Sequence, residues 1–322
     1  MSRAIKIWMI VGASLILLGA LIFVGVMSVM GWDFKKLSTE KYETNTYSID
    51  SEYKNITLIT DTADVIVLPS QSGKTVVECY EREKEKHAVS VGDDGTLTVE
   101  LVDERKWYDH ISIGFNSPEI TLYIPEGEYG SLYIKGTTGD VKIAKDFSFS
   151  DITAEGTTGD VECYASSAEK TSIRISTGDV LVENITCGSL DLKTTTGSII
   201  ARRINCSGAV NAEVRTGKCE MDTLSCRSFN AKAGTGDITL KGVIASETMR
   251  VDGTTGDVEL YRCDASELDL TTTTGDIEGT LLTDKVFTYK TNTGDVDLPE
   301  SISGGICRVK TVTGDIEIDI VK

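Results

Sequence analysis

Proline, histidine and positive charge are scarce in this chain of 322 residues. There are 4 prolines, and the only two histidines, His87 and His110, leave little material for histidine-based catalysis or a histidine-rich metal site. The 32 basic residues are outnumbered by 50 acidic ones, which gives a net charge of -18. This balance argues against binding to nucleic acid and against docking on anionic lipid headgroups, because both need a cationic surface.

Familiar catalytic and cofactor motifs are also missing. The sequence has no phosphate-binding loop, no G-x-S-x-G, no H-E-x-x-H and no C-x-x-C. We therefore predict a protein that is not an enzyme and that has no firm metal site or cofactor.

One long apolar segment is present near the N-terminus. Residues Ile7 to Met30 carry no charge, and at about 1.5 Å per residue they are long enough to cross a bilayer core. Trp8 and Trp32 bracket the segment, as interfacial aromatic residues do. The run is too long for a cleaved signal peptide, so we predict an uncleaved signal anchor.

Charges on either side of this segment bear on its orientation. Arg3 and Lys6 favour a cytoplasmic N-terminus, while Lys35 and Lys36 on the other side weaken the bias. We place the large C-terminal part outside the cytoplasm, in a protein that crosses the cell membrane once. The expected divisions are a cytoplasmic end (1–6), a transmembrane helix (7–31), a stalk (32–46), an irregular β start or cap (47–131) and a regular repeat (132–322).

A Thr-Gly motif, usually followed by Asp, recurs from Thr138 almost to the end of the chain. Its glycines stand at 139, 159, 178, 197, 217, 236, 256, 275, 294 and 314. The step between them is nearly constant at about 20 residues, a period typical of a solenoid in which each repeat forms one coil. Ten coils stacked about 4.8 Å apart would make a rod on the order of 50 Å long.

Apolar residues recur at fixed distances from each motif glycine. They lie two and four residues after it, and seven and five residues before it, as in Val258, Leu260, Met249 and Val251 around Gly256. Spacing by two on both sides predicts two strands per coil, each with one face inward. The fold class is therefore an all-β, single-chain parallel β-solenoid with the glycine at a corner.

The same spacing occurs once more, upstream. With Ala63 in the glycine position, the four inward positions hold Ile56, Leu58, Val65 and Val67. Either three irregular coils or a cap with other strand pairings would fill the stretch between Ala63 and Gly139.

Stacked coils would align the motif aspartates along one edge of the rod. Calcium takes several oxygen ligands, so a calcium ladder is one interpretation for Asp237, Asp257, Asp276, Asp295 and Asp315. The alternative is a turn residue that caps local backbone N–H groups and repeats because the corner repeats. Ser198 and Lys218 interrupt the column, and Lys218 would repel a cation.

A second acidic column lies one residue beyond the first inward position. It consists of Glu162, Glu220, Glu259, Glu278, Asp297 and Glu317. A repeated exposed ladder offers no unique carboxylate pair for catalysis, and we interpret it as a solvated acidic face.

Two further features of the sequence each allow two interpretations. Cys187, Cys206 and Cys226 lie nine residues after their glycines in successive coils, where they are either buried thiols or close enough for a disulfide. In the segment from 106 to 115, Trp107, Tyr108 and His110 form either a partner-binding surface or a hydrophobic cap on the first coil.

The chain ends on "GDIEIDIVK", within a strand. We expect an open terminal coil there, able to pair with another chain unless charges such as Glu317 and Asp319 blunt its edge.

The anchor followed by "GWDFKKLSTEKYE", then "DTADVIVLPS", "ITLYIPEG" and the "TTGDV" repeats resembles a known family. It is similar to the membrane-anchored bacterial β-repeat proteins known as "putative adhesins", among them LiaG-like envelope proteins. The resemblance implies a cell-envelope protein with a β-solenoid ectodomain and, in some members, a link to envelope stress. It brings no catalytic or ligand residues.

Two functions remain open on this basis. The first is a non-enzymatic surface module that binds an envelope protein or a cell-wall polymer through the rod. The second is a structural or sensory scaffold that contacts other membrane proteins. A carbohydrate-active β-helix enzyme is disfavoured, because the nearly constant step between motifs leaves no insertions to build a cleft.

Overall fold

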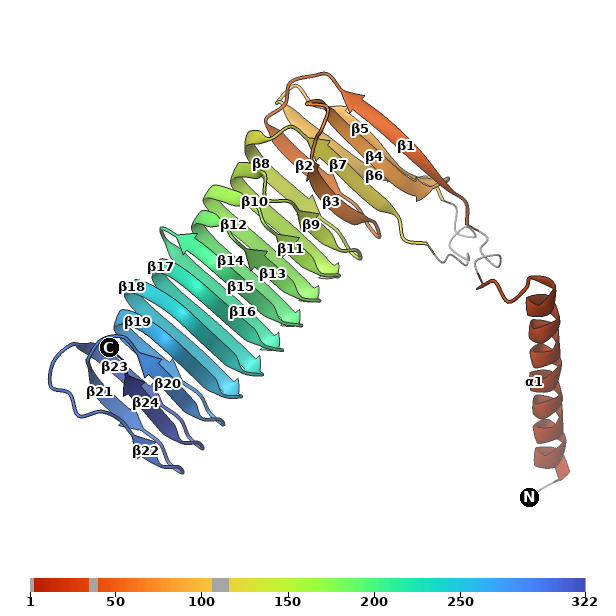
Figure 1. The fold of residues 1–322 in the computed structure, drawn as a ribbon. Helices are drawn as coiled ribbons and strands as arrows, with labels where there is room; N and C mark the ends of the chain where they lie inside the picture. Colours follow the sequence, from red (N-terminus) through yellow and green to blue (C-terminus); the bar gives the residue numbers. More distant parts are fainter. Residues whose placement is uncertain (1–2, 35–39, 106–115, 322) are drawn as a thin grey trace.

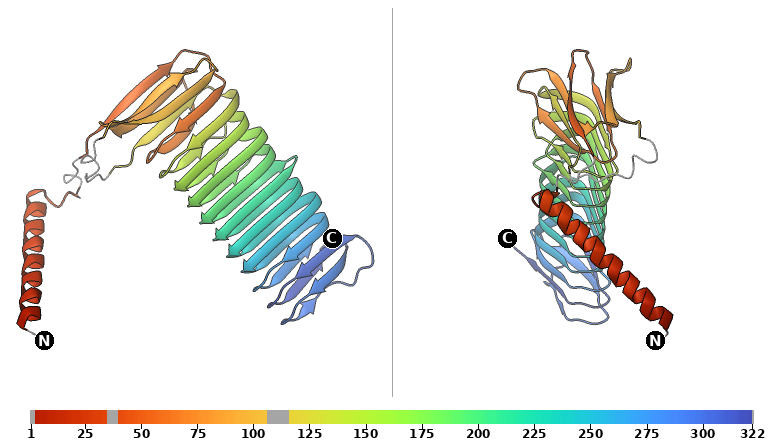
Figure 2. Two further views of the ribbon diagram at one scale, coloured as in Figure 1. Left: turned by 180° about the vertical axis from the view of Figure 1, so that it is seen from behind. Right: turned by 90° about the vertical axis from the view of Figure 1, so that its right-hand side faces the viewer.

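The computed structural model describes residues 3–34, 40–105 and 116–321. Its one long helix is α1 (Arg3–Val29), of which Ile5–Val29 has a mean hydropathy of 2.6 and the length to cross a membrane. The rest is a β-solenoid rod with an antiparallel cap at its N-terminal end (Figures 1 and 2). The predicted fold class is confirmed.

The cap and the first coil come first in the chain. Their strands are β1 (Tyr42–Ile49), β2 (Asn55–Ile59), β3 (Asp64–Pro69), β4 (Thr75–Arg82), β5 (Glu85–Val91), β6 (Thr96–Asp103) and β7 (Glu119–Ile124).

The remaining strands form the coils after the cap. They are β8 (Gly127–Lys135), β9 (Val141–Ile143), β10 (Phe147–Thr158), β11 (Val161–Cys163), β12 (Ser166–Thr177), β13 (Val180–Glu183), β14 (Thr186–Thr196), β15 (Ile199–Cys206), β16 (Ala209–Thr216), β17 (Cys219–Thr235), β18 (Ile238–Thr255), β19 (Val258–Thr271), β20 (Ile277–Leu281), β21 (Lys285–Lys290), β22 (Val296–Asp297), β23 (Gly305–Lys310) and β24 (Ile316–Ile320).

Each motif glycine is a corner at which two coils touch. Gly178 has φ +136°, and a Cβ placed there would lie 2.0 Å from the carbonyl oxygen of Gly159 in the coil before it. Gly178 in turn presents its own carbonyl oxygen to the next coil, where it accepts a hydrogen bond from the buried Thr194 hydroxyl at 3.1 Å. Only glycine combines this backbone angle with this approach.

The inward columns are buried as the spacing predicts, but in the middle of the rod the two predicted inward faces do not account for the whole coil. There, a second corner follows each glycine by six residues, at Asn184, Arg203, Thr223, Gly242 and Arg262, all with φ between 53° and 60°. A third buried side follows this corner, as in Ile185 and Cys187. These coils are therefore three-sided.

At the N-terminal end, the first coil stacks directly on the regular repeat. Strand β2 pairs in parallel with β8, and β3 with β9, although Ala63 and Gly139 are far apart in the sequence. On the outer side, β6 and β7 add one more parallel layer, and β4, β5 and β1 close it with antiparallel pairings. The intervening residues thus form a cap of other strand pairings rather than three irregular coils.

At the C-terminal end, the coils do not stack in chain order. The last coil, β23 and β24, lies between β19–β20 on one side and β21–β22 on the other (Figure 1). The expectation that β24 forms the open edge is therefore wrong, because β21 and β22 are outermost. This explains why Phe287 and Val296, at inward positions of the outer coil, are only half-buried and why Tyr289 is exposed.

A buried lysine holds this exchanged order together. Lys285 of the outer coil reaches past the last coil, and its Nζ lies 2.6 Å from Asp264 Oδ1. Gly305 leaves the path open, since a Cβ there would lie 2.1 Å from the Ser266 carbonyl oxygen and 3.6 Å from Lys285 Cδ. A buried charged pair breaks at a high cost, so it favours this order of coils over the sequential one.

The corner contact predicts a large effect of adding one carbon. The change Gly178→Ala should lower the free energy of unfolding by about 3 kcal/mol or more, since it adds backbone strain to a steric clash. Gly127→Ala is the control, because nothing lies within 4 Å of a Cβ at that position. Urea denaturation followed by circular dichroism measures both, and equal effects would contradict the corner geometry.

The contact between Lys285 and Asp264 predicts that two lysine variants differ in stability. Lys285→Met should lower the free energy of unfolding by about 2 kcal/mol, because it removes a charged hydrogen bond to Asp264. Lys290→Met on the exposed side of the same strand should change it by less than about 0.5 kcal/mol. If the two variants melt alike, Lys285 does not fix the order of the last coils.

Candidate functional site

The aspartates of the corner column form a hydrogen-bonded ladder between coils. The backbone N–H of Asp160 donates to Asp140 Oδ1 at 2.8 Å, and that of Asp179 donates to Asp160 Oδ1 at 2.8 Å. The ladder continues through the exchanged C-terminal order, where Asp315 N–H donates to Asp276 Oδ1 and Asp295 N–H donates to Asp315 Oδ1, both at 2.7 Å. Each carboxylate thus ties its coil to the next one.

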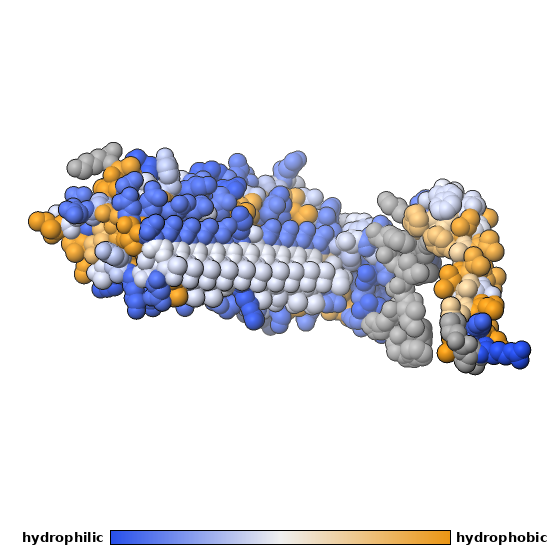
Figure 3. Space-filling model, turned by 90° about the horizontal axis from the view of Figure 1, so that it is seen from below, coloured by the Kyte–Doolittle hydropathy of each residue, from blue (hydrophilic) through white to orange (hydrophobic). Residues whose placement is uncertain are grey.

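The five aspartates proposed for calcium are neighbours in this ladder, in the spatial order 237, 257, 276, 315 and 295. One oxygen of Asp237, Asp257, Asp276 and Asp315 already accepts a backbone N–H. At the interruption in the column, Lys218 Nζ lies 3.5 Å from Asp237 Oδ2. This geometry favours the turn-residue interpretation, and the calcium ladder stays a prediction. Figure 3 shows a pale band of intermediate hydropathy along the rod, bordered by hydrophilic residues.

The second acidic column leads to an open groove with a volume of about 580 Å³ near the C-terminal end. The groove lies where the coils narrow. Leu260 and Cys263 of β19 pair with Gly279 and Leu281 of β20, so β20 has one residue fewer at its corner. Gly279 permits the close approach, since a Cβ there would lie 1.9 Å from the Leu260 carbonyl oxygen.

Carboxylates dominate the lining of this groove. Glu259, Glu278 and Glu317 stand in register on three neighbouring strands, and Asp319 lies beside them. Burial, followed by repulsion from Glu259 and Glu317, raises the pKa of Glu278. Like charges directly opposite each other in a sheet destabilise it, so this stack of acids is a local cost to the fold.

Elsewhere in the same column the acids are neutralised. Lys142 Nζ lies 2.7 Å from Glu162 Oε2, and Arg202 Nη2 lies 3.7 Å from Glu220 Oε1. Among the described residues, no ion pair is formed by Glu259, Glu278 or Glu317. The groove is therefore a stretch of this column where acidic charge accumulates without an ion-paired base.

One base and one aromatic ring complete the groove. Lys241 lies on β18, and Tyr261 on β19 exposes 62% of its surface. The groove thus offers carboxylate oxygens and one aromatic face, but no histidine or cysteine. This set of groups can bind cations, by charge and by cation–π contact, and has no evident nucleophile.

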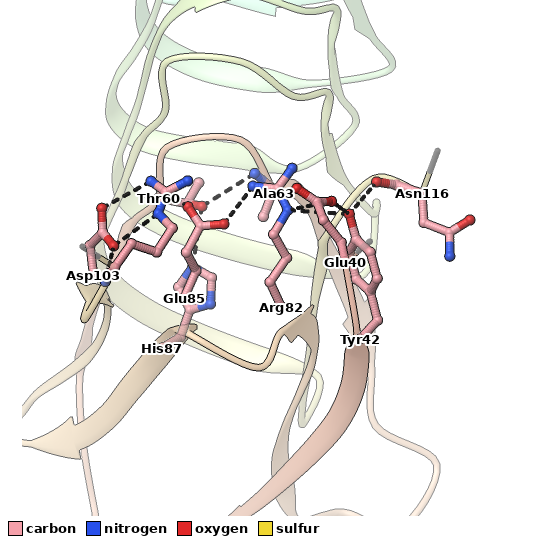
Figure 4. A network of polar contacts seen from close by, with 10 residues as sticks. Glu40, Tyr42, Thr60, Ala63, Arg82, Glu85, His87, Asp103 and Asn116 are labelled. Atoms are coloured by element: carbon pink, nitrogen blue, oxygen red, sulfur yellow. Dashed lines mark hydrogen bonds and ion pairs between the residues drawn. The ribbon is translucent and has the colours of Figure 1, made fainter. Parts of the chain in front are cut away.

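A second polar site lies at the capped end, where the corner column stops at Ala63. Arg82 bridges Glu40 and Glu85, with Nε 3.0 Å from Glu40 Oε2 and Nη1 2.5 Å from Glu85 Oε2 (Figure 4). Arg105 Nη2 lies 2.6 Å from Glu85 Oε1 and 2.9 Å from Asp103 Oδ2. Burial opposes the charge of Arg82, but hydrogen bonds to Glu85 and Tyr42 outweigh it and raise its pKa.

This ion-pair network joins the residues just before β1 to the capped end of the rod. Glu40 precedes β1, and the backbone N–H of Glu83 donates to the Lys41 carbonyl oxygen at 3.0 Å. The Tyr42 hydroxyl lies 2.7 Å from the carbonyl oxygen of Asn116 (Figure 4). The chain that enters from the α1 side is thus fixed to the end of the first coil.

The cysteines are free and buried. Cys187 and Cys206 are partners in the register of β14 and β15, and their mutual hydrogen bond lowers the pKa of Cys206 and raises that of Cys187. Cys187, Cys206 and Cys226 are buried, whereas Ala168 and Asp284, which stand at the same distance from their glycines, are exposed. Trp107, Tyr108 and His110 lie outside the described residues, so the surface predicted there stays a prediction.

Comparison with known proteins identifies the family. The Toastrack DUF4097 family model matches residues 53–217 and 206–322, and the chain therefore belongs to this family. The membership agrees with the resemblance noted from the repeats. A search of curated proteins gave no match.

Solved structures show similar chain courses at low identity. A "putative adhesin" from Parabacteroides merdae is 13% identical, covers 88% of this chain and 98% of its own, and has a TM-score of 0.49. A "putative lipid binding protein" from Parabacteroides distasonis is 18% identical over 88% and 98% of the two chains, with a TM-score of 0.43. At these values the likeness carries no information on function.

The ladder geometry predicts how the protein responds to calcium. Because the aspartate Oδ1 atoms already accept backbone hydrogens, the Tm of the protein should not change in millimolar calcium. A ligand that binds only the folded state would raise the Tm. A rise that the double variant Asp257→Asn/Asp276→Asn abolishes would establish the calcium ladder instead.

Proposed function

We propose that this Toastrack chain is a membrane-anchored, non-enzymatic binding module of the cell envelope. In this proposal α1 crosses the membrane once and the solenoid stands outside the cytoplasm. The acidic groove beside Tyr261 takes a positively charged partner, either a protein or a cationic cell-wall polymer.

The observation that carries the proposal is the unpaired stack of Glu259, Glu278 and Glu317. In the earlier coils the same column pairs its acids with Lys142 and Arg202, so the fold has a local means of neutralising them. Lys241 lines the groove but forms no ion pair with these three acids, which leaves a repulsion that a bound cation would relieve. A partner of opposite charge therefore gains more there than at any of the neutralised positions.

The shape of the rod and the way it is attached would hold the groove away from the end that follows α1. The groove lies near the end of the rod opposite the cap, and the network around Arg82 fixes the cap to the chain that follows α1 (Figure 1). Coils that each contact only their neighbours form an extended surface, which repeat proteins use for binding.

A scaffold that contacts other membrane proteins is the second candidate, and the outermost coil favours it. Tyr289 on β21 and Ile302 after β22 expose 57% and 100% of their surfaces, and β21 has no neighbouring strand on its outer side among the described residues. Exposed apolar side chains beside an open strand edge are typical of protein–protein contacts.

The groove is tested by photo-crosslinking of the full-length chain in intact cells. A photoreactive residue at position 261 should capture one basic partner, and the same residue at position 232, exposed on another side of the rod, should not. The double variant Glu259→Gln/Glu278→Gln should reduce the yield about 5-fold, as loss of two exposed charge contacts predicts. Capture of the same molecules at both positions, or a yield that the variant does not change, would contradict the proposal.

A further inference from the structure

The β4–β5 hairpin carries a second cluster of chemical groups, set behind the ion-pair network. The two strands pair only at Arg82 and Glu85 and then separate, with β4 joining β7 and β5 joining β6. The interior between them is apolar along most of its length, but at the hairpin end it is lined by Cys79, Glu81 and His87. All three side chains are buried, with 0%, 0% and 3% of their surfaces exposed.

The three side chains converge on one point. The Cys79 sulfur, a Glu81 oxygen and a ring nitrogen of His87 all lie within 4.8 Å of one another. Glu81 Oε2 lies 2.8 Å from His87 Nδ1 and accepts the His87 backbone N–H at 2.7 Å. Thiolate, imidazole and carboxylate are the three side-chain ligands of zinc-class ions.

The outer atoms of two of these groups are already held in place. Asn45 Nδ2 donates to Glu81 Oε1 at 2.7 Å, which leaves Oε2 directed at the cluster. The Thr60 hydroxyl lies 3.2 Å from His87 Nε2, so it can accept a hydrogen from that nitrogen and leave the lone pair on Nδ1 (Figure 4). Partners of this kind fix the tautomer and the orientation of metal ligands.

The charge of the cluster also requires a cation. Within residues 40–105 and 116–321, no lysine or arginine forms an ion pair with Glu81, because Arg82 is engaged by Glu40 and Glu85, and Lys86 by Glu43. A fully buried carboxylate needs a compensating charge. A metal ion bound between the three side chains would supply that charge.

We propose that Cys79 Sγ, Glu81 Oε2 and His87 Nδ1 form a buried site for one divalent transition-metal ion of the zinc class. Calcium and magnesium do not fit, because they require oxygen ligands throughout. Binding forms a bond from the sulfur to the metal and releases the thiol proton of Cys79 to solvent. The ion joins β4 to β5, whose strand register is limited to Arg82 and Glu85, and so stabilises the cap.

Cobalt titration of the full-length protein in detergent, kept reduced and first stripped with a chelator, tests the site. We expect one Co²⁺ per chain, a thiolate-to-cobalt charge-transfer band and a higher Tm. Cys79→Ser should abolish the band. Cys163→Ser, which alters an equally buried thiol outside the cluster, should keep it.

A second pair of variants covers the case in which Cys79→Ser fails to fold. Thr60→Val and Asn45→Ala leave all three ligands in place, and each should weaken Co²⁺ binding about 10- to 100-fold, as loss of a ligand-orienting contact does. Absence of saturable binding in the parent protein, or binding that none of these substitutions weakens, would overturn the proposal.

Discussion

The structure depends on the contact between successive corners, where a glycine of one coil presses on the carbonyl of the glycine before it. The approach is so close that a Cβ at Gly178 would lie 2.0 Å from the Gly159 oxygen. The aspartate after each of these glycines then accepts the backbone N–H of the corresponding residue in the next coil. The corner therefore fixes both the spacing and the register of the coils, and the apolar columns become a continuous core as a result.

The groups that could bind a partner or a metal ion lie where this regularity is interrupted. The acidic groove forms where β20 loses one corner residue opposite β19. The ion-pair network and the cluster of Cys79, Glu81 and His87 lie where the corner column ends at Ala63. A uniform rod offers many equal positions, so a unique site requires such an interruption.

Much of this fold can be predicted from the sequence, because each corner of the Thr-Gly repeat requires a glycine and no other residue can take its place. The glycine spacing predicted the coils, and the pattern around Ala63 pointed to the first one. The third side of the coils escaped prediction, since its corner holds Asn184, Arg203, Thr223, Gly242 and Arg262, which share a backbone angle but no chemistry. The groove had one signal in the sequence, the glycine at position 279 in an inward column.

The order of the last two coils could not be predicted from spacing, because both have the same period. The deciding contact joins Lys285 to Asp264, which belongs to an earlier coil, and depends on the missing side chain of Gly305. Likewise, the acidic column predicted an exposed face, but which of its members lack a basic neighbour depends on the pairing of coils. The cluster of Cys79, Glu81 and His87 brings together residues of β4 and β5, two strands that pair at only one position. The alternation of inward and outward residues along each strand does not reveal that these three side chains meet.

Amide hydrogen exchange along the corner column tests the central claim most directly. If the corners tie the coils together, the N–H groups of Asp160, Asp179 and Asp276 should exchange as slowly as those of the adjoining strands, although their side chains are exposed. Protection should also extend through Asp315 and Asp295 at the end of the rod. Exchange at these amides as fast as in ordinary exposed turns would show that the corners do not bind one coil to the next.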